Sequence, residues 1–315
     1  MLPAGFNYLF KQNVMKRFIL AGTFVAGIAV CFTGLSLFGF KEEPAAQTKA
    51  SGFSQVPPPS IPESMSFAGE AVPLQRWEIR EQLDRELSYN YYQPGNIYYM
   101  LKLSARHFPQ IEAQLKANNI PDDFKYLCVA ESNIQNLISK VGATGFWQFM
   151  KSTAPGYNLE VNATVDERYH VAKSTDAACT YLKKAYAKFG NWTAAAASYN
   201  CGMGGYNERS SFQGTTNYYD LVLHEETQRY IFRILAFKHL LGNADSLGFK
   251  LPAASAYEPI KTRKLLVSQS IANLSTYARN NGSNYKILKW LNPWLRGKSL
   301  TVRPGKTYEI VLPAE

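Results

Sequence analysis

The chain is poor in the residues that cross-link small domains or hold metal ions. Its 315 residues include four cysteines, of which Cys31 lies in an apolar run, leaving Cys128, Cys179 and Cys201. An odd number does not complete a disulfide framework, although one pair among the three stays open. The four histidines are scattered without the spacing of metal ligands: His107, His170, His224 and His239. We therefore expect no metal site and no cofactor.

Acidic residues are scarce relative to basic ones. With 34 Lys and Arg against 24 Asp and Glu, the formal net charge is +10. Residues 258–315 alone hold ten Lys and Arg against three Glu, a difference of +7. A basic surface of this kind fits anionic polymers or lipid headgroups, and nucleic acid would satisfy the same charge.

One long apolar run lies near the N-terminus. Phe18–Phe40 has 23 residues and no charged side chain, enough to cross a membrane as a helix. Three basic residues precede it, so residues 1–17 are predicted to be cytoplasmic and the remainder to lie outside. That location argues against nucleic acid as a partner. We predict an uncleaved anchor over 18–40. A cleaved signal peptide and a lipoprotein modified at Cys31 are the alternatives.

The next segment, residues 41–71, reads as a flexible linker because it combines five prolines with small polar residues and has no apolar period. The folded part is expected to begin near Val72. Helical periodicity dominates from there and strand signals are scarce, so the fold class is mainly α. Helices are expected over residues 77–90, 97–107, 109–118, 124–131, 174–190, 193–200 and 226–241. Aspartates before residue 124 are expected to cap the fourth of these.

Glu131 is the strongest candidate for chemistry. Residues 124, 127, 128 and 131 follow the spacing of one helix face, and the first three are apolar. The carboxyl group should therefore face the core, where desolvation raises its pKa toward the range of a general acid. The alternative is an ordinary glutamate at a helix border with a satisfied partner.

No second acid accompanies Glu131 in three segments that carry polar candidates, residues 131–132, 145–149 and 198–200. Most glycosidases need two carboxyl groups, but a substrate-assisted route uses one. The next acids along the chain are Glu160, Asp166 and Glu167. Asp166, Glu167 and Arg168 are interpreted as a charge-assisted tie between a loop and a neighbouring element.

Seven short motifs follow one another between residues 119 and 240: LCVAES (127–132), GATGFWQFM (142–150), VDER (165–168), STDAA (174–178), FGNW (189–192), SYNCG (198–202) and ETQRY (226–230). In order and spacing they resemble the family 1 lytic transglycosylases, goose-lysozyme-like enzymes that cleave peptidoglycan. The resemblance implies a lysozyme-like helical domain over 72–250. It also implies that Glu131 acts first as acid and then as base, leaving a 1,6-anhydro-N-acetylmuramic acid end without consuming water.

The resemblance also assigns substrate-binding roles. It implies that Ser132 helps to hold the carboxylate, that Gln148 hydrogen-bonds the sugar, and that Tyr199 and Asn200 contact the N-acetyl group. Glu226 is expected to shape the cleft. For Ser132 the alternative is a bond to its own helix backbone. For Glu226 it is a charge favoured by the helix dipole.

Three residues depart from the family pattern. Ser198 stands where alanine is usual and Phe146 where leucine is common, and both changes are small. Gln228 replaces an arginine, which removes a cation near Glu226 and puts the role of that glutamate in doubt. Phe146 and Trp147 could line the groove or pack in the core, and packing is favoured for Phe146.

Residues 258–315 resemble a degenerate LysM-like module, a small α+β unit with a strand-helix-helix-strand layout that binds N-acetylglucosamine chains. The usual opening motif of glycine and aspartate is missing. A basic surface for anionic wall polymers and a simple packing appendage are the alternatives.

Together these patterns predict a membrane-anchored lytic transglycosylase that acts on peptidoglycan glycan strands in the periplasm, with wall-remodelling enzymes as further partners. A goose-type lysozyme that hydrolyses the same bond is the nearest alternative. A catalytically silent peptidoglycan-binding scaffold is another.

Overall fold

The structure, a computed structural model, describes residues 57 and 59–314. The predicted tail, the anchor over 18–40 and most of the linker lie outside these residues. Within the described part of the chain, no helix is both long and apolar enough to cross a membrane.

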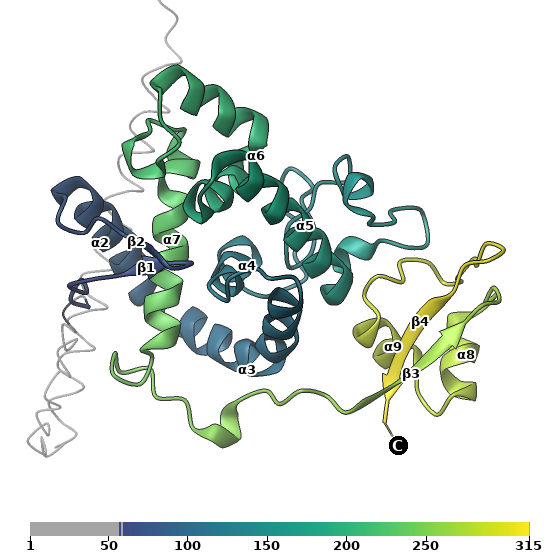
Figure 1. The fold of residues 1–315 in the computed structure, drawn as a ribbon. Helices are drawn as coiled ribbons and strands as arrows, with labels where there is room; N and C mark the ends of the chain where they lie inside the picture. The colour runs from purple at the N-terminus through teal and green to yellow at the C-terminus, as the bar shows by residue number, and fades with distance from the viewer. Residues whose placement is uncertain (1–56, 58, 315) are drawn as a thin grey trace, which may run out of the picture. The chain divides into compact units, whose positions relative to one another are not determined.

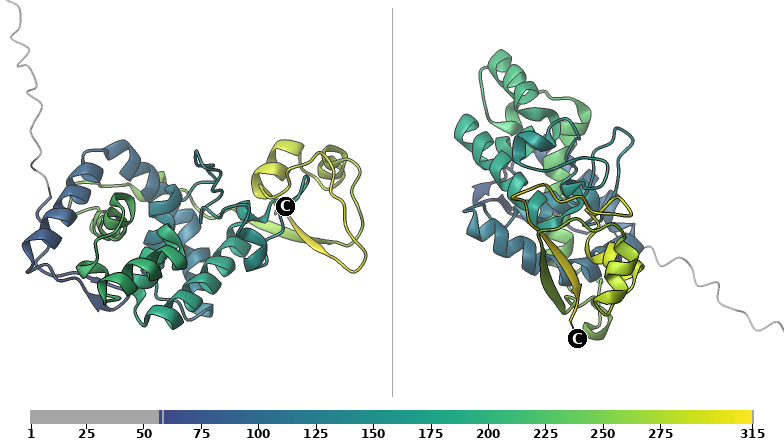
Figure 2. Two further views of the ribbon diagram at one scale, coloured as in Figure 1. Left: turned by 90° about the horizontal axis from the view of Figure 1, so that it is seen from above. Right: turned by 90° about the vertical axis from the view of Figure 1, so that its right-hand side faces the viewer.

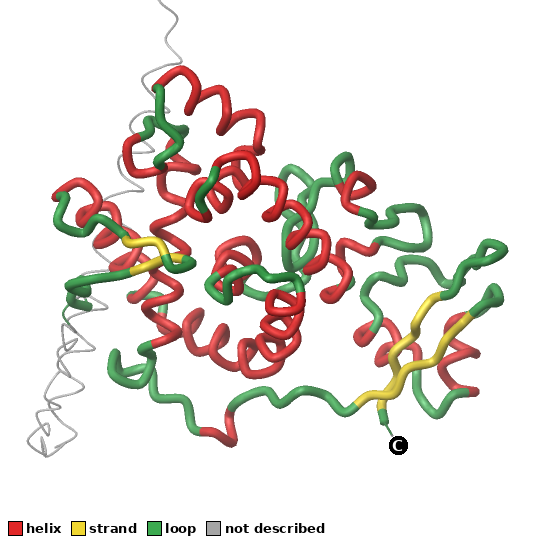
Figure 3. Tube along the Cα trace, in the orientation of Figure 1, coloured by secondary structure: helices red, strands yellow, loops and turns green. Residues whose placement is uncertain are grey.

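Residues 77–242 are mainly helical, as predicted (Figure 3). The long helices are α2 (Trp77–Tyr91), α3 (Pro94–Ala117), α4 (Phe124–Ser132), α5 (Val171–Phe189), α6 (Trp192–Gln213) and α7 (Glu225–Gly242). Short 3-10 helices lie at η1 (Ala154–Tyr157), η2 (Glu167–Tyr169), η3 (Tyr218–Asp220) and η4 (Ala253–Ser255). Figure 1 shows α4 surrounded by α3, α5, α6 and α7, and α4 packs directly on α3 and α7.

The predicted boundary between two helices near residue 108 is wrong. The expected pair over 97–107 and 109–118 is the single helix α3, with Pro109 inside it. Proline removes one helical hydrogen bond, but Leu103, Ile111 and Leu115 are buried on both sides of it and hold the helix together. The predicted stop of the alanine-rich helix is confirmed at Gly202, where φ is +77° and the backbone is not helical. A second helical segment, which the sequence did not predict, follows directly and completes α6 as far as Gln213.

The expected aspartate cap of α4 is also wrong. Asp123 makes no capping hydrogen bond to that helix. Its carboxylate instead accepts hydrogen bonds from the backbone N–H of Ala68 and from Lys238 Nζ, both at 2.7 Å. Asp123 thus joins the start of α4 to an N-terminal hairpin and to α7.

The folded part begins before the predicted boundary at Val72. Strands β1 (Ser66–Phe67) and β2 (Glu70–Ala71) form an antiparallel hairpin. Phe67 is fully buried, with its ring 5.2 Å from that of Phe124. The Glu70 carboxylate accepts the backbone N–H groups of Trp192 and Thr193 at the N-terminus of α6, where the helix dipole favours a negative charge.

The C-terminal module has the predicted strand-helix-helix-strand order: β3 (Thr262–Val267), α8 (Leu274–Asn280), α9 (Tyr285–Leu291) and β4 (Tyr308–Pro313). The two strands are antiparallel and lie side by side in both views of Figure 2, with Thr262 opposite Pro313 and Val267 opposite Tyr308. The buried side chains of the module form a cluster separate from the main core.

Candidate active site

Glu131 lies in the last turn of α4. The predicted buried face is confirmed, because Phe124, Leu127 and Cys128 are fully buried. Asn133 ends the helix in the left-handed conformation, with φ +52°. The glutamate itself remains partly exposed. Its carboxyl group therefore sits at the border between the core and solvent, at the negative end of the helix dipole.

The electrostatic surroundings of Glu131 shift its proton affinity strongly. Burial raises the pKa of its carboxyl group from 4.5 to about 7. A hydrogen bond from the Tyr230 hydroxyl and the charge of Arg233 lower the pKa, while the charge of Glu226 raises it. Because this pKa lies near 7, both the protonated and the ionised forms of Glu131 are populated near neutral pH.

Tyr230 is a site residue that the sequence did not reveal. It lies on α7, is almost fully buried, and donates its hydroxyl proton to Glu131 Oε1. It is the last residue of the motif over 226–230, and the family resemblance implied no role for it. Its position one helical turn after Glu226 places both side chains on the same face of α7 and could have suggested the contact.

Ser132 does not hold the carboxylate as the resemblance implied. It is buried, and its hydroxyl donates to the backbone carbonyl of Phe146 at 2.8 Å. A weaker contact of 3.3 Å reaches the carbonyl of Cys128 in its own helix. Ser132 therefore ties α4 to the loop that carries the second motif.

That loop, residues 142–149, depends on unusual backbone conformations. Gly145 has φ +86°, and a Cβ there would lie 2.0 Å from the carbonyl oxygen of Arg168, so only glycine fits. Gln148 also has a positive φ of 49°. The Gln148 amide donates to the carbonyls of Gly145 at 2.7 Å and Leu137 at 3.2 Å. This side chain therefore helps to shape the loop, while its carbonyl oxygen has no hydrogen-bond donor among the described residues.

The SYNCG motif (198–202) lies against this loop. Tyr199 donates its hydroxyl proton to the carbonyl of Trp147 at 2.8 Å, and burial raises the pKa of Tyr199 well above its usual value. Asn200 accepts a hydrogen bond from Thr227 Oγ1 at 2.8 Å. Trp147 is fully buried and donates from its indole to Thr175, so it packs rather than lines a groove.

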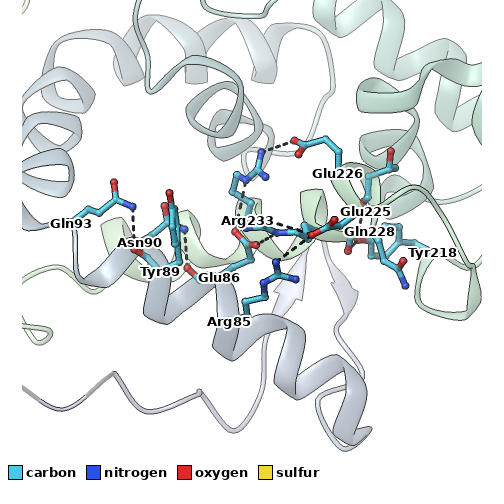
Figure 4. A network of polar contacts seen from close by, with 12 residues as sticks. Arg85, Glu86, Tyr89, Asn90, Gln93, Tyr218, Glu225, Glu226, Gln228 and Arg233 are labelled. Carbon is cyan, nitrogen blue, oxygen red and sulfur yellow. Dashed lines mark hydrogen bonds and ion pairs between the residues drawn. The ribbon is translucent and has the colours of Figure 1, made fainter. Parts of the chain in front are cut away.

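Glu226 has a cation beside it despite the missing arginine at position 228. It lies in the first turn of α7 with an exposed side chain, and Arg233 contacts its carboxylate at 2.9 Å. Figure 4 shows Arg233 between Glu226 and Glu86. Glu226 also lies at the N-terminus of α7, where the helix dipole interacts favourably with a negative charge.

A buried ion-pair network holds α7 against α2. Glu86 is fully buried, with Arg229 Nε at 2.6 Å and Arg233 Nε at 3.8 Å from its carboxylate oxygens. At the surface, Glu225 contacts Arg85 at 3.3 Å. Removing one partner of a buried pair leaves an uncompensated charge and is strongly destabilising. The network therefore fixes the helix that carries Tyr230 and Glu226.

A polar cavity of about 400 Å³ adjoins the network. Its lining includes Ala130 and Asn133, one residue before and two residues after Glu131 on α4. Side-chain amides and the two arginines of α7 supply most of its polar groups: Asn90, Gln93, Asn96, Arg229 and Arg233. A polar ligand in this cavity would find hydrogen-bond donors, although Glu131 itself is not among the lining residues.

The residues that could hold a metal do not gather in the part of the chain that the structure describes. No group of three or more His, Cys, Asp or Glu side chains lies close enough there to bind an ion. Cys128, Cys179 and Cys201 are free thiols, so the pairing left open by the sequence is not formed.

Two domain families match this chain. Residues 108–222 match the transglycosylase SLT domain, and residues 263–315 match the soluble lytic transglycosylase C-terminal LysM-like domain. The chain is also similar to membrane-bound lytic murein transglycosylase D from two strains of Escherichia coli, K12 and O6:H1 CFT073. It is 28% identical to each over 196 residues, which cover 60% of this chain and 43% of the relative.

The chain thus spans less than half the length of the curated relatives it matches. The helices that carry Glu131, Tyr199 and Asn200 all lie within the first matched region. The strand-helix-helix-strand module falls almost entirely within the second. The expected resemblance is confirmed, and the chain contains a transglycosylase SLT domain followed by a LysM-like domain of the soluble lytic transglycosylase C-terminal family.

Proposed function

We propose that this protein is a peptidoglycan lytic transglycosylase in which Glu131 is the single acid and base. The observation that carries the proposal is a partly buried carboxyl group with a pKa of about 7, placed within a matched SLT domain. A group that must first give and then take a proton works best when its pKa lies near the working pH.

The reaction begins with Glu131 protonated. Its proton passes to the glycosidic oxygen as the β-1,4 bond from N-acetylmuramic acid C1 to N-acetylglucosamine breaks. The carbonyl oxygen of the N-acetyl group bonds to C1 and holds the sugar as an oxazolinium ion, the substrate-assisted alternative to a second carboxylate. The ionised Glu131 then takes the proton of the C6 hydroxyl group, and the oxygen of that hydroxyl attacks C1. The bond between C1 and the N-acetyl carbonyl oxygen breaks in this step, the N-acetyl group stays on C2, and the new bond from O6 to C1 closes the 1,6-anhydro ring.

The surrounding residues support these two proton transfers. Tyr230 holds one oxygen of the Glu131 carboxylate, so that the other is free to face the sugar. Tyr199 and Asn200 border the N-acetyl group, and the unpaired carbonyl oxygen of Gln148 accepts a hydrogen bond from a sugar hydroxyl. Glu226 shapes the cleft and, through its negative charge, helps to keep Glu131 protonated.

Hydrolysis of the same bond is the second candidate. The exposed carboxylate of Glu226 favours it, because this group is close enough to Glu131 to raise the pKa of that residue. An acid in this position could activate a water molecule in the way that inverting glycosidases do.

Digestion of purified sacculi separates the candidates. The wild-type protein is expected to release fragments that mass spectrometry shows to be one water lighter than hydrolysis products. Glu131→Gln should release none, whereas Glu226→Gln should still form anhydro ends at a reduced rate. Fragments with reducing ends that disappear in Glu226→Gln would establish the hydrolase instead. Retention on sacculi without any release would identify a binding scaffold.

We further propose that residues 18–40 anchor the protein in the cytoplasmic membrane and that the domains over 72–250 and 258–315 act in the periplasm. The proposal is supported by the length and apolar character of the run and by the basic residues before it. A variant in which a cleavable secretion signal replaces residues 1–40 should move from the membrane to the soluble periplasmic fraction. A deletion variant that still sediments with membranes would contradict the anchor.

A further inference from the structure

The C-terminal module is joined to the SLT domain by backbone hydrogen bonds. The N–H of Asp166 donates to the carbonyl of Trp294 at 2.8 Å, and the N–H groups of Arg296 and Gly297 donate to the carbonyl of Thr164 at 2.7 and 3.2 Å. Bonds of this kind fix the register between two segments in the way that a strand pair does. The module therefore meets one defined segment of the SLT domain, residues 160–169, which we call the docking loop.

Side chains strengthen this contact. Lys306 forms an ion pair with Glu160 of the docking loop, and Tyr308 donates to the same carboxylate at 2.9 Å. The guanidinium of Arg296 lies 4.2 Å from the ring centre of Tyr169. Val165 of the docking loop is fully buried within the hydrophobic cluster of the module. Apolar burial shared by two units resists their separation.

The docking loop is in turn fastened to the loop over residues 142–149. Asp166 binds Arg168 through two parallel contacts, from Nε at 2.9 Å and from a terminal nitrogen at 2.7 Å. The other terminal nitrogen of Arg168 donates to the carbonyls of Gly142 and Phe149, each at 3.1 Å. Both side chains of the pair are largely buried. This arrangement confirms the charge-assisted tie that the sequence indicated.

The same 142–149 loop then contacts the residues around Glu131. Its Phe146 carbonyl accepts from Ser132, the residue next to Glu131, and its Trp147 carbonyl accepts from Tyr199. Hydrogen bonds, joined by the backbone of the docking loop and of the 142–149 loop, therefore connect Trp294 in the module to the last turn of α4. Each step is a short contact to backbone or a buried ion pair, so movement at one end has few ways to be absorbed.

We propose that the LysM-like module acts as a brace for the candidate active site, with Arg168 as the positioning residue that passes its support to the 142–149 loop. The expected effect on turnover rests on the proposed function, whereas the support of the 142–149 loop by the module rests on the contacts alone. Bracing is a role that does not require glycan binding by the module.

Two variants loosen the docking without touching the catalytic groups. Lys306→Ala removes the ion pair to Glu160, and its matched control is Lys264→Ala, whose lysine pairs with Glu309 inside the module at 3.0 Å. Gly297→Val is the stronger change, because a Cβ at Gly297 lies 2.9 Å from Thr164 Cγ2 and would push the two segments apart. Both are made in the full-length protein.

Hydrogen exchange gives the structural readout. In Lys306→Ala and Gly297→Val the backbone amides of residues 142–149 should exchange faster, while those of β3 and β4 stay protected because the module remains folded. Lys264→Ala should leave the loop unchanged. The double variant Glu160→Lys with Lys306→Glu reverses the pair and should restore slow exchange in the loop.

Turnover gives the functional readout. Gly297→Val should lower kcat about tenfold with KM unchanged, because displaced catalytic geometry slows the reaction without weakening binding. Arg168→Lys, which keeps the charge but loses the planar fork, should give the same pattern. Retention on sacculi should not change in any of these variants.

Unchanged loop exchange in Gly297→Val, or equal effects of Lys306→Ala and Lys264→Ala, would overturn the brace. A rise in KM with loss of retention on sacculi would overturn it in favour of a glycan-binding module. If the wild-type protein releases no fragments at all, the proposed function fails, and the exchange experiment still decides whether the module supports the loop.

Discussion

The candidate active site has two halves that are built in different ways. One half is helical: α4 and α7 supply Glu131, Tyr230 and Glu226 and are held by buried apolar faces and by the ion pairs around Glu86. The other half is the irregular loop over 142–149, held by hydrogen bonds from side chains to backbone carbonyls. The first half sets the proton affinity of Glu131, and under the proposed function the second half would set where a sugar lies.

The difference predicts different responses to mutation. A helix packed on several neighbours tolerates loss of a single polar contact, because apolar burial supplies most of its stability. The 142–149 loop buries Phe146, Trp147 and Phe149 in the core, but its irregular backbone is held by side-chain donors. Each backbone carbonyl that loses its donor leaves a buried acceptor unpaired. Changes in the helical half should therefore alter chemistry, and changes in the loop half should alter structure first.

Glu131→Gln is expected to have the largest effect on activity and to leave the fold unchanged. The amide cannot donate or accept the proton in turn, so release of fragments from sacculi should fall roughly a thousandfold. The circular dichroism spectrum should match that of the wild-type protein, because the side chain keeps its size. A variant with more than a tenth of wild-type activity would remove Glu131 from the mechanism.

Gly145→Ala should be the most damaging change in the loop half. The new Cβ would lie 2.0 Å from the Arg168 carbonyl and the residue would also need a positive φ, so we expect a loss of about 3 kcal/mol in unfolding free energy. Gly142→Ala is the matched control. It has the same φ of +86° but no atom within 4 Å, so about 1 kcal/mol is expected.

Chemical denaturation of the two variants measures the difference. Equal losses in Gly145→Ala and Gly142→Ala would mean that the close approach of the Arg168 carbonyl does not constrain the loop.

Tyr230→Phe tests the proton affinity set by the helical half. The Tyr230 hydroxyl stabilises the ionised form of Glu131 and lowers its pKa, so removing it should raise that pKa above its value of about 7. The alkaline limb of the pH–rate profile should then move to higher pH, with kcat roughly fivefold lower because the carboxyl group loses one hydrogen bond. Tyr218→Phe is the control, since the Tyr218 hydroxyl donates to the backbone of Thr227 instead. An alkaline limb that moves to lower pH would contradict the assignment.

The smallest effect concerns stability. Because the pKa of Glu131 is raised from 4.5 to about 7, the folded protein binds an extra proton between these values. Stability contributed by this group is complete below pH 4.5 and is lost as pH rises through 7. Glu131→Gln removes the penalty, so it should be more stable than wild type at pH 8 by about 1–3 kcal/mol, and the difference should shrink toward pH 4.5. Thermal melts across this range measure it, and a constant difference would mean that Glu131 is not shifted.

The sequence predicted the helical half better than the loop half. The apolar spacing of residues 124, 127 and 128 located both α4 and Glu131, because a helix face repeats in a way that a single sequence shows. The order of elements in the C-terminal module was also predicted. The roles of the site residues in binding a sugar stay predictions.

What failed depends on contacts between segments distant in the chain. Asp123 matches the pattern of a helix cap, yet its carboxylate binds Lys238 and Ala68, and nothing in the local pattern distinguishes these partners. Ser132 was paired with its neighbour because the partner it has, the Phe146 carbonyl, lies in a loop without periodicity. Pro109 stays inside a helix because packing on both sides outweighs one missing hydrogen bond.

The N-terminal hairpin has a mechanical consequence. A pull on the chain from its N-terminal side reaches first Pro59, which is buried, and Ile61, which packs on the main core. It then reaches the hairpin at Ser66–Ala71. In the hairpin, Phe67 is buried against Phe124, and the Glu70 carboxylate accepts two backbone hydrogen bonds from the N-terminus of α6. Neither contact passes through the 142–149 loop. A load applied to the start of the fold would thus be carried by α6 and the start of α4, while the docking loop and the 142–149 loop stay unloaded.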